Sequence, residues 1–453
     1  MKEMTIRQAL VSTGGVFYGD ECALDNIITA VESDSRKIKG GEIFVAFSGA
    51  RVDGHSFMAQ CLQKGAVCCL SEREPAPEER PCIRVDSTLR AMGALAAWHR
   101  SRFDIPVVGI TGSVGKTTTK EMVAAVLSQH FNTHKTRMNF NNELGVPQTL
   151  LKLEASHEAS VVEMGISDFG EMRRLTHMVC PTIALISAIA DSHLETLQNR
   201  QGVLRAKSEI FESMGAEHLA IFNGDDPMLK GLVPPTRKLT YGMEEQNDFR
   251  AEDVEALGIE GIRCTIRHGD AAFKAFVPAH GLHMVYAALA AAAVGNALGM
   301  SDEEIARGIQ CYQTVGDRAK IIQARDMTVI SDCYNANPSS VAAALRSLML
   351  LEGRKVCILG DMLELGNAKE QLHTETGILA AKCGVDLIIA CGELSRHTFD
   401  GAKQAQAQAL WFPNKEALFA QLSGLLKPGD NVLVKASHSM AFEEVTSVLV
   451  GKY

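Results

Sequence analysis

Short, strongly apolar runs that end in Gly, Asp or Asn recur along the chain, and they constrain its fold more than any other feature. The middle of the chain holds four of them, VVGITG at 107–112, ASVVEMG at 159–165, TIALISAI at 182–189 and HLAIFNGDD at 218–226. Their length and their β-branched residues are typical of buried strands. Continuous apolar strands favour a parallel sheet that helices cover on both faces.

The same alternation occurs at both ends of the chain. After residue 316 the strand candidates are MTVISD at 327–332, KVCILGD at 355–361, DLIIACG at 386–392 and NVLVKAS at 431–437. No GxGxxG follows any of them, so this unit is Rossmann-like without the glycine fingerprint. Before residue 104 we expect strands at 40–47 and 65–71, and a helix over 87–103 that Ser87 or Thr88 caps.

A chain of 453 residues corresponds to about three domains. We therefore predict an α/β protein with three units. They are a small N-terminal α/β domain at 1–103, a central P-loop-type parallel-sheet ATPase domain at 104–316 and a C-terminal Rossmann-like α/β domain at 317–453.

Charge and hydropathy exclude several classes of partner. The net charge of -9 argues against binding to nucleic acid, which needs clustered cations. No apolar run reaches the roughly 18 residues of a membrane span, and MKEMTIRQAL lacks the apolar stretch of a signal peptide. The 12 cysteines are scattered without a CxxC pair. We interpret them as the buried, reduced thiols of a cytoplasmic protein and expect no membrane insertion.

The segment GITGSVGKTTTKE at 109–121 is the sharpest chemical motif. It follows a strand and opens a helix, which is the arrangement in which backbone N–H groups cradle phosphates. Lys116 would reach the β- and γ-phosphates of ATP, and Thr117 would ligate Mg²⁺. Ile110 stands where the strict P-loop pattern has Gly, so this is a variant of it. The predicted phosphate-binding residues are Thr111, Gly112, Ser113, Val114, Gly115, Lys116, Thr117 and Thr118.

Polar residues follow the next two strands. Glu163 ends one strand, and His193 comes after the other, with Asp191 and Glu195 as alternates. The carboxyl ends of parallel strands meet at one edge, so we expect Glu163 and His193 beside the loop as metal ligands. Considered alone, Glu163 could equally be a helix-capping acid and His193 a surface histidine. Lys207 by itself reads as a solvated lysine.

The segment DCYNANPSS at 332–340 predicts a second nucleotide contact after a strand of the C-terminal unit. Asp332 would accept a hydrogen bond from a ribose hydroxyl, and Asn335 or Asn337 would pair with an amide or a base edge. A helix-capping turn is the alternative. Asp361, in GDMLELG at 360–366, occupies a similar strand end.

Together these motifs resemble those of the Mur ligase family, ATP-dependent amide-forming enzymes of peptidoglycan precursor synthesis. The resemblance covers nearly the whole chain in order. DSRKIKGGEIFVAFSGARVDGHSF at 34–57, YNANPSS and GDMLELG narrow it to the members that add D-alanyl-D-alanine to UDP-N-acetylmuramoyl-tripeptide. The resemblance thus implies an ADP-forming ligase that works through an acyl phosphate, in the cytoplasm, and we expect a monomer.

The resemblance also implies roles for single residues. Lys116, Lys207 and His193 would be the catalytic residues, and Lys207 matches a family lysine that CO₂ carbamylates. The implied Mg²⁺ ligands are Thr117, Glu163, His193 and carbamylated Lys207. The implied nucleotide contacts in the last domain are Arg318, Asp332 and Asn335. The implied substrate contacts are Ser35 and Arg36 at the uridine-diphosphate end, Asn141 and Asn142 in MNFNNELGVP, and Asn337.

The chain departs from the family pattern at Ala188, Ala190, Met284 and Ala287, where Asn, Gly, Asn and Asn are usual. These departures motivate one alternative, a divergent nucleotide-binding paralogue with weak ligase activity. Another Mur-type or folylpolyglutamate-type ligase is the second alternative. The folate enzymes lack the N-terminal segment at 34–57, which argues against that variant.

Overall fold

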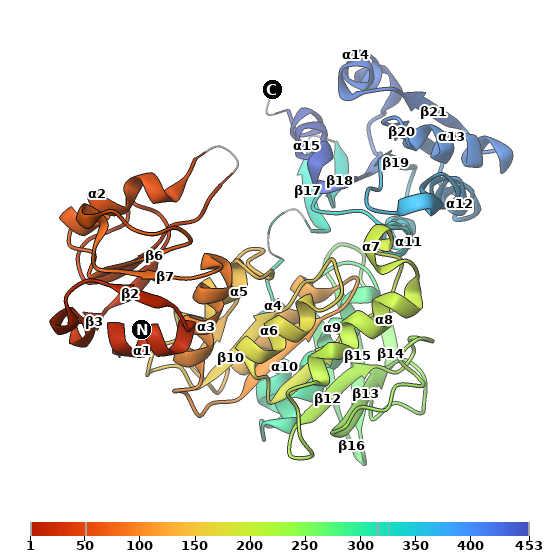
Figure 1. The fold of residues 1–453 in the computed structure, drawn as a ribbon. Coiled ribbons are helices and arrows are strands. Elements are labelled where there is room, and N and C mark those ends of the chain that lie inside the picture. Colours follow the sequence, from red (N-terminus) through yellow and green to blue (C-terminus); the bar gives the residue numbers. More distant parts are fainter. Residues whose placement is uncertain (1, 50–51, 315, 317, 325, 452–453) are drawn as a thin grey trace.

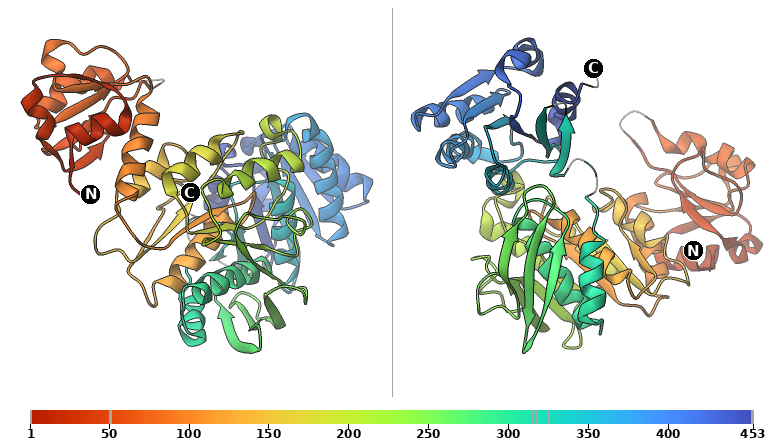
Figure 2. Two further views of the ribbon diagram at one scale, coloured as in Figure 1. Left: turned by 60° about the horizontal axis from the view of Figure 1, so that its bottom comes forward. Right: turned by 180° about the vertical axis from the view of Figure 1, so that it is seen from behind.

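The computed structural model describes residues 2–49, 52–314, 316, 318–324 and 326–451. Over these ranges the chain is an α/β protein, as predicted; it contains four sheets, and Figure 1 shows three bodies. The N-terminal body (red to orange) and the C-terminal body (blue) sit on different parts of the central body, and the views of Figure 2 agree. The predicted boundary at 316–317 falls partly outside the described residues.

The N-terminal body holds a sheet of strand order β2-β7-β6-β5-β4 and a small β1-β3 pair. Its strands are β1 (Met4–Thr5), β2 (Val16–Tyr18), β3 (Ile27–Ile28), β4 (Ala30–Glu32), β5 (Glu42–Val45), β6 (Cys68–Ser71) and β7 (Cys82–Arg84). Its helices are α1 (Ile6–Thr13), α2 (Met58–Gln63) and α3 (Thr88–Arg100). The two strands and the helix predicted here are confirmed, and the Ser87 side chain accepts from Arg90 N as the cap.

Helix α3 joins the N-terminal body to the central one, because its two apolar faces enter different cores. Ala91 and Leu95 pack in the N-terminal core, whereas Met92 and Ala96 pack in the core of the central body. At its end, the Arg100 guanidinium donates to the carbonyl oxygens of Val179 and Cys180. The helix therefore fixes the N-terminal body to the central body.

The central body is built on a sheet of order β16-β15-β14-β13-β12-β11-β8-β10-β9. Its strands are β8 (Val107–Thr111), β9 (Thr133–Lys135), β10 (Ala159–Glu163), β11 (Ile183–Ile186), β12 (Leu219–Asn223), β13 (Arg237–Gly242), β14 (Phe249–Ala256), β15 (Ile262–His268) and β16 (Ala271–Val277). Its helices are α4 (Lys116–Leu127), α5 (Gly145–Leu150), α6 (Glu171–Val179), α7 (Leu194–Leu197), α8 (Arg200–Ser208), α9 (His283–Ala297) and α10 (Asp302–Gln310).

The four strands predicted for the central region pair in parallel as expected, and at one edge the sheet continues with antiparallel strands that were not predicted. Strands β8 to β13 pair in parallel, but β15 runs antiparallel to β14 and to β16. Buried residues alternate with exposed or half-buried ones along most of β15 and along the first half of β14. This pattern is typical of an antiparallel sheet with one solvated face.

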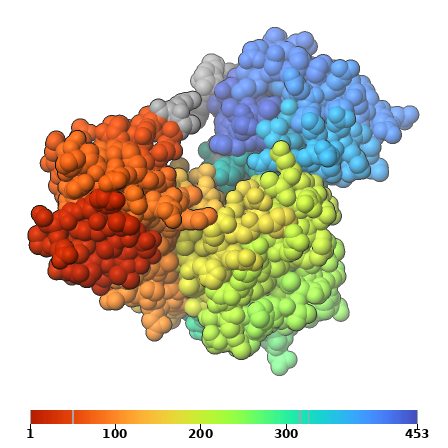
Figure 3. All heavy atoms as spheres, in the orientation of Figure 1, coloured from red at the N-terminus to blue at the C-terminus, as the bar shows by residue number. Residues whose placement is uncertain are grey.

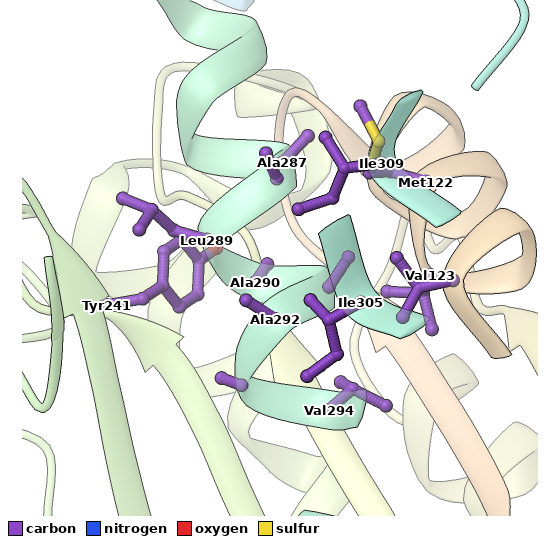
Figure 4. Close-up of a cluster of buried hydrophobic side chains, with 14 of the residues drawn as sticks. Met122, Val123, Tyr241, Ala287, Leu289, Ala290, Ala292, Val294, Ile305 and Ile309 are labelled. Carbon is purple, nitrogen blue, oxygen red and sulfur yellow. The ribbon is translucent and has the colours of Figure 1, made fainter. Parts of the chain in front are cut away.

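The Ala-rich helix predicted near the end of the central region is α9, and it is buried. Small side chains on α9 let it lie close to α4 and α10, with which it shares one core. Figure 4 shows Met122 and Val123 of α4 facing Ile305 and Ile309 of α10, with α9 alongside. This core supports α4, the helix that follows the phosphate loop.

The C-terminal body has a sheet of order β17-β18-β22-β19-β20-β21, and only β17 runs antiparallel to its neighbour. Its strands are β17 (Lys320–Ala324), β18 (Met327–Ser331), β19 (Lys355–Gly360), β20 (Leu387–Cys391), β21 (Ala409–Phe412) and β22 (Asn431–Lys435). Its helices are α11 (Pro338–Met349), α12 (Lys369–Lys382), α13 (Ser395–Gln404), α14 (Lys415–Leu425) and α15 (Glu443–Leu449). All four strands predicted from the sequence are present.

All twelve cysteines lie in described residues and are free thiols; eight of them are buried, whereas Cys22, Cys180 and Cys311 are exposed and Cys383 is half-buried. Across the described part of the chain, no helix has both the length and the apolarity that crossing a bilayer requires.

Candidate active site

The strand order of the central sheet brings the predicted site residues together. Strand β8 lies between β11 and β10, and all three run in parallel, so the segments that follow them meet at one edge. Those segments are the phosphate loop, the segment after Glu163, and residues 187–193. An edge where neighbouring connections diverge is the usual ligand site of such sheets.

The phosphate loop has the backbone that its glycines allow. Gly115 adopts a φ of 80° and caps α4, a conformation that a residue with a Cβ rarely takes. A Cβ on Gly112 would lie 2.1 Å from Ser187 Oγ, so only glycine fits there. The loop therefore ends in the exposed N-terminus of a 12-residue helix, where an anion is favoured.

Residues 187–190 hold the loop in place mainly through their main chain. Ser113 N donates to Ala188 O at 2.8 Å, and Ser113 Oγ donates to Ala190 O at 3.0 Å. Ser187 Oγ donates to Val114 O at 2.6 Å. Because Ala188 and Ala190 act through backbone atoms, their departure from the family pattern leaves these contacts intact.

Glu163 is the centre of a buried polar cluster. Its side chain accepts from Thr117 Oγ1 at 2.9 Å and from Asn141 Nδ2 at 2.8 Å, and the residue is 1% exposed. Lys120 Nζ lies 3.6 Å from Glu163 Oε2 and donates to Thr136 O at 2.9 Å. Lys120 is fully buried and was not found from the sequence, although TTTKE contains this second lysine.

Two further amines belong to this part of the site, Lys116 at the start of α4 and Lys207 on α8. Lys116 Nζ donates to Gly112 O at 2.7 Å. Burial lowers the pKa of Lys116, and the negative charge of Glu163 offsets part of this effect. Lys207, on α8, is 1% exposed. Burial and then the charge of Lys116 lower the pKa of Lys207 well below its ordinary value. Lys207 is thus not the solvated lysine that it resembled in isolation.

The C-terminal body contributes a second polar cluster. Lys435 Nζ, at the end of β22, donates to Asp332 Oδ2 at 2.5 Å and to Asn335 O at 2.9 Å. Asp332 Oδ1 also accepts from Ala319 N at 3.2 Å. The Arg318 guanidinium stacks 3.5 Å from the centre of the Tyr334 ring. Lys435 could have been suspected, because a lysine ends an otherwise apolar strand.

A cavity of about 700 Å³ lies between the central and C-terminal bodies and joins the two clusters. Figure 3 shows the C-terminal body (blue) in contact with the central body (yellow to green). The predicted site residues that line it are Ser113, Val114, Gly115, Lys116, Thr117, Thr118, Asn141, Asn142, Glu163, His193, Arg318, Asp332, Asn335 and Asn337. Met284 and Ala287 line it too, as apolar surface.

Some predicted site residues lie elsewhere or have a structural task. Thr111, Gly112 and Lys207 are not among the residues that line the cavity, and the side chains of Thr111 and Lys207 are buried. Ser35 and Arg36 belong to the N-terminal body, where Arg36 pairs with Asp34 and is exposed. Two residues that line the cavity also accept main-chain hydrogen bonds: Asn142 Oδ1 accepts from Gly145 N, and Asn337 Oδ1, as the cap of α11, accepts from Ser340 N. For Asn337 the alternative of a capping turn is therefore the one observed.

His193 connects the two bodies. Its Nδ1 lies 2.8 Å from Oε2 of Glu364, which belongs to the C-terminal body. The hydrogen bond from His193 lowers the pKa of Glu364. Of the two alternates, Asp191 pairs with Arg200 and Glu195 is exposed.

Comparison with known proteins agrees with this geometry. Three family models match: the Mur ligase family catalytic domain over 27–100, the Mur ligase middle domain over 110–295 and the Mur ligase glutamate ligase domain over 317–438. A UDP-N-acetylmuramoyl-tripeptide–D-alanyl-D-alanine ligase of Bacillus subtilis is 35% identical over 94% of this chain and 93% of its own.

Solved structures give the same result. A crystal structure of MurF from Acinetobacter baumannii matches 99% of both chains with 31% identity and a TM-score of 0.91. A MurF ligase from Thermotoga maritima in complex with ADP matches 93% of this chain and 96% of its own, with 26% identity and a TM-score of 0.83. The chain, with its phosphate loop facing a C-terminal polar cluster across one cavity, belongs to the Mur ligase family.

Proposed function

We propose that this protein is an ATP-dependent ligase that joins D-alanyl-D-alanine to UDP-N-acetylmuramoyl-tripeptide. One observation carries the proposal: a phosphate loop in one body and the Asp332, Asn335 and Arg318 cluster of another line a single cavity. A cavity divided in this way closes around a nucleotide when the bodies approach. The relatives named above, similar over their full lengths, supply the identity of the two substrates.

The nucleotide fits the cavity from both sides. Loop N–H groups and Lys116 would hold the phosphates of ATP, and Asp332 would accept from a ribose hydroxyl. The Arg318 guanidinium, stacked on Tyr334, adds a cation on the opposite side. Met284 and Ala287 offer apolar surface rather than amide groups to the base. Base recognition would then depend on stacking and on main-chain contacts.

The residues also fit Mg²⁺. Thr117 Oγ1 and the Glu163 carboxylate are buried and lie within 3.0 Å of each other, so a single Mg²⁺ would contact both. His193 lines the same cavity. Among the described residues, no three His, Cys, Asp or Glu side chains cluster as a metal site, so hydroxyl and modified-lysine oxygens would complete the set. Mg²⁺, when bound, neutralises charge on the phosphates.

Lys207 has the properties that carbamylation requires. The neutral amine attacks CO₂, a new N–C bond forms, and a proton leaves. A buried lysine with a strongly lowered pKa supplies that neutral amine at physiological pH. The resulting anion would lie near Lys116, whose positive charge would stabilise it.

The proposed reaction has two steps, and this chain mainly provides position and charge. The tripeptide carboxylate attacks the γ-phosphorus, and ADP leaves with the electron pair of the broken P–O bond. Lys116 holds the γ-phosphate as negative charge shifts toward ADP. The neutral amine of D-alanyl-D-alanine then attacks the acyl carbon. Inorganic phosphate leaves, and the amine loses a proton. The walls of the cavity exclude water, which would hydrolyse the acyl phosphate.

The three bodies divide this labour. Residues 1–103, with Ser35 and Arg36, would bind the nucleotide sugar; residues 104–316 would bind ATP; and residues 317–453 would close the site. We infer a monomer, because the residues of the proposed site all come from one chain. Free thiols throughout are consistent with a reducing cytoplasm.

Phosphate release tests the proposal. The protein is mixed with ATP, Mg²⁺ and UDP-N-acetylmuramoyl-tripeptide, with and without D-alanyl-D-alanine, and the product is identified by mass spectrometry. We expect release that depends on the dipeptide and a product heavier by its residue mass. Folded protein that shows no dipeptide-dependent release contradicts the proposal and favours the weak paralogue. Release that depends instead on a folate and glutamate would identify the other branch.

A further inference from the structure

The contact between His193 and Glu364 crosses the boundary between two bodies. Glu364 lies in the segment between β19 and the short 3-10 helix Gly366–Ala368. Besides the 2.8 Å approach of the side chains, Leu194 N donates to Glu364 O at 3.1 Å. Figure 1 shows α7, which begins at Leu194, beside α11 and the C-terminal body. Glu364 is thus joined through its side chain to His193 and through its main chain to Leu194, the next residue.

Both residues of this contact have an unusual backbone. His193 has a φ of 50° and Glu364 a φ of 61°, in the left-handed region that residues with a Cβ rarely adopt. Such conformations persist only where surrounding contacts maintain them, and they concentrate at functional sites. Two of them face each other here. The backbone on each side is therefore held in the conformation that brings the imidazole and the carboxylate together.

The chemistry of the pair assigns the imidazole tautomer. An ionised carboxylate only accepts hydrogen bonds, so His193 Nδ1 carries the hydrogen that Glu364 accepts. Nε2 then keeps its lone pair, which is the form of histidine that ligates metals. A carboxylate behind a histidine ligand also fixes the ring orientation and raises the basicity of the ligating nitrogen.

We propose that Glu364 is a positioning residue that orients His193 for Mg²⁺. The inference rests on the proposed function, in which His193 holds a metal ion beside the nucleotide. It makes metal affinity depend on a residue that is not itself a metal ligand. The metal ligand belongs to the central body, and the group that orients it belongs to the C-terminal body. Metal affinity should therefore increase when the C-terminal body is docked as it is here.

Removal of Glu364 should leave the fold intact, because its side chain is 60% exposed and an exposed ion pair contributes little to stability. Mn²⁺ binding, measured by electron paramagnetic resonance with β,γ-methylene-ATP present, tests the proposal. We expect Glu364→Ala to weaken Mn²⁺ binding by about 10- to 100-fold. Glu364→Gln should weaken it less, because its amide oxygen still accepts from Nδ1. Glu370→Gln, an exposed glutamate of the same body, is the matched control and should change nothing.

Two further measurements separate positioning from a general structural effect. In a His193→Ala background, Glu364→Ala should cause no additional loss of Mn²⁺ affinity, because the residue to be oriented is gone. In the metal-free protein, imidazole ¹⁵N resonances should report His193 with hydrogen on Nδ1, and a mixture of tautomers in Glu364→Ala. The His193→Ala variant identifies the His193 signals among the 14 histidines.

The outcomes also distinguish this inference from the proposed function. Equal Mn²⁺ affinity in the wild-type protein and Glu364→Ala overturns the inference, as does a wild-type His193 with hydrogen on Nε2. In either case, dipeptide-dependent phosphate release would still support the proposed ligase function. Conversely, weakened Mn²⁺ binding in Glu364→Ala without any dipeptide-dependent release supports the inference and contradicts the ligase.

Discussion

His99 should make the stability of the protein depend on pH. It lies on α3, is fully buried, and donates from Nε2 to Leu153 O of the central body at 3.0 Å. Its Nδ1 has no hydrogen-bond partner among the described residues. Protonation would bury an unpaired donor and a charge. Burial, opposed by the bond to Leu153, lowers the pKa of His99 from 6.5 to about 4.

The sign and size of the effect follow from this lowered pKa. The pKa of the folded state lies below that of the unfolded state, so between pH 6.5 and 4 the unfolded chain binds more protons. Stability that is present above pH 6.5 is therefore lost as the pH falls. From pH 7.5 to pH 5.0 the loss attributable to His99 is about 2 kcal/mol, because a tenfold difference in proton affinity between the two states corresponds to about 1.4 kcal/mol.

The assay uses Trp98, the neighbour of His99 on α3, as a fluorescent reporter. The chain has two tryptophans, and Trp411→Phe removes the other one. Urea unfolding of this protein is compared with that of His99→Gln in the same background at pH 7.5 and 5.0. Gln retains an amide donor for Leu153 O but does not titrate. Its free energy of unfolding should fall about 2 kcal/mol less than that of the parent.

His134, whose pKa burial also lowers to about 4, is present in both proteins and cancels in the comparison. If the two proteins lose stability in parallel between pH 7.5 and 5.0, the reasoning about His99 is refuted.

Three lysines of the site give further predictions. Lys116→Ala should reduce dipeptide-dependent phosphate release by about 1,000-fold or more with an unchanged circular dichroism spectrum, because the γ-phosphate loses its cation; near-normal turnover would contradict that role. Lys207→Ala should be inactive and partly rescued by short carboxylates in the same assay, and absence of rescue would count against a carbamate. Lys120→Met should lower the free energy of unfolding by about 3–5 kcal/mol in a denaturant titration, since it removes the buried cation that lies 3.0 Å from Glu121 and 3.6 Å from Glu163. A loss below about 1 kcal/mol would show that Lys120 is not coupled to these two carboxylates.

Strands could be predicted from the sequence where all their residues are buried, and they were missed where buried and exposed residues alternate. The run at 159–165 became β10 with every residue buried, because a strand covered on both faces must be apolar throughout. Strands β14 to β16 were missed, since one face of each is partly solvated and their apolar residues are diluted by Glu, Arg and Lys. The short strands β2 and β4 carry too few residues for any pattern to emerge.

The residues of the candidate site also fall into a predictable group and an unpredictable group. The phosphate loop and Glu163 were predictable, because local spacing and strand ends determine where they lie. Lys120 and Lys435 were not found, because their importance comes from partners far away in the chain, Lys435 with Asp332 above all. Glu364 could not be paired with His193 from the sequence, because the pairing depends on how two bodies dock.

The attachment of helix α3 has a consequence for substrate selection. Arg100 and the shared apolar faces of α3 fix the N-terminal body to the central one, so we expect the distance from Ser35 to Lys116 to stay nearly constant when the substrate binds. On the proposed function, a substrate anchored by its diphosphate must span that fixed distance to present its carboxylate to ATP. The enzyme would then select its substrate by length. A precursor one amino acid too short or too long would place its carboxylate out of reach of the phosphorus, whatever its side chains are.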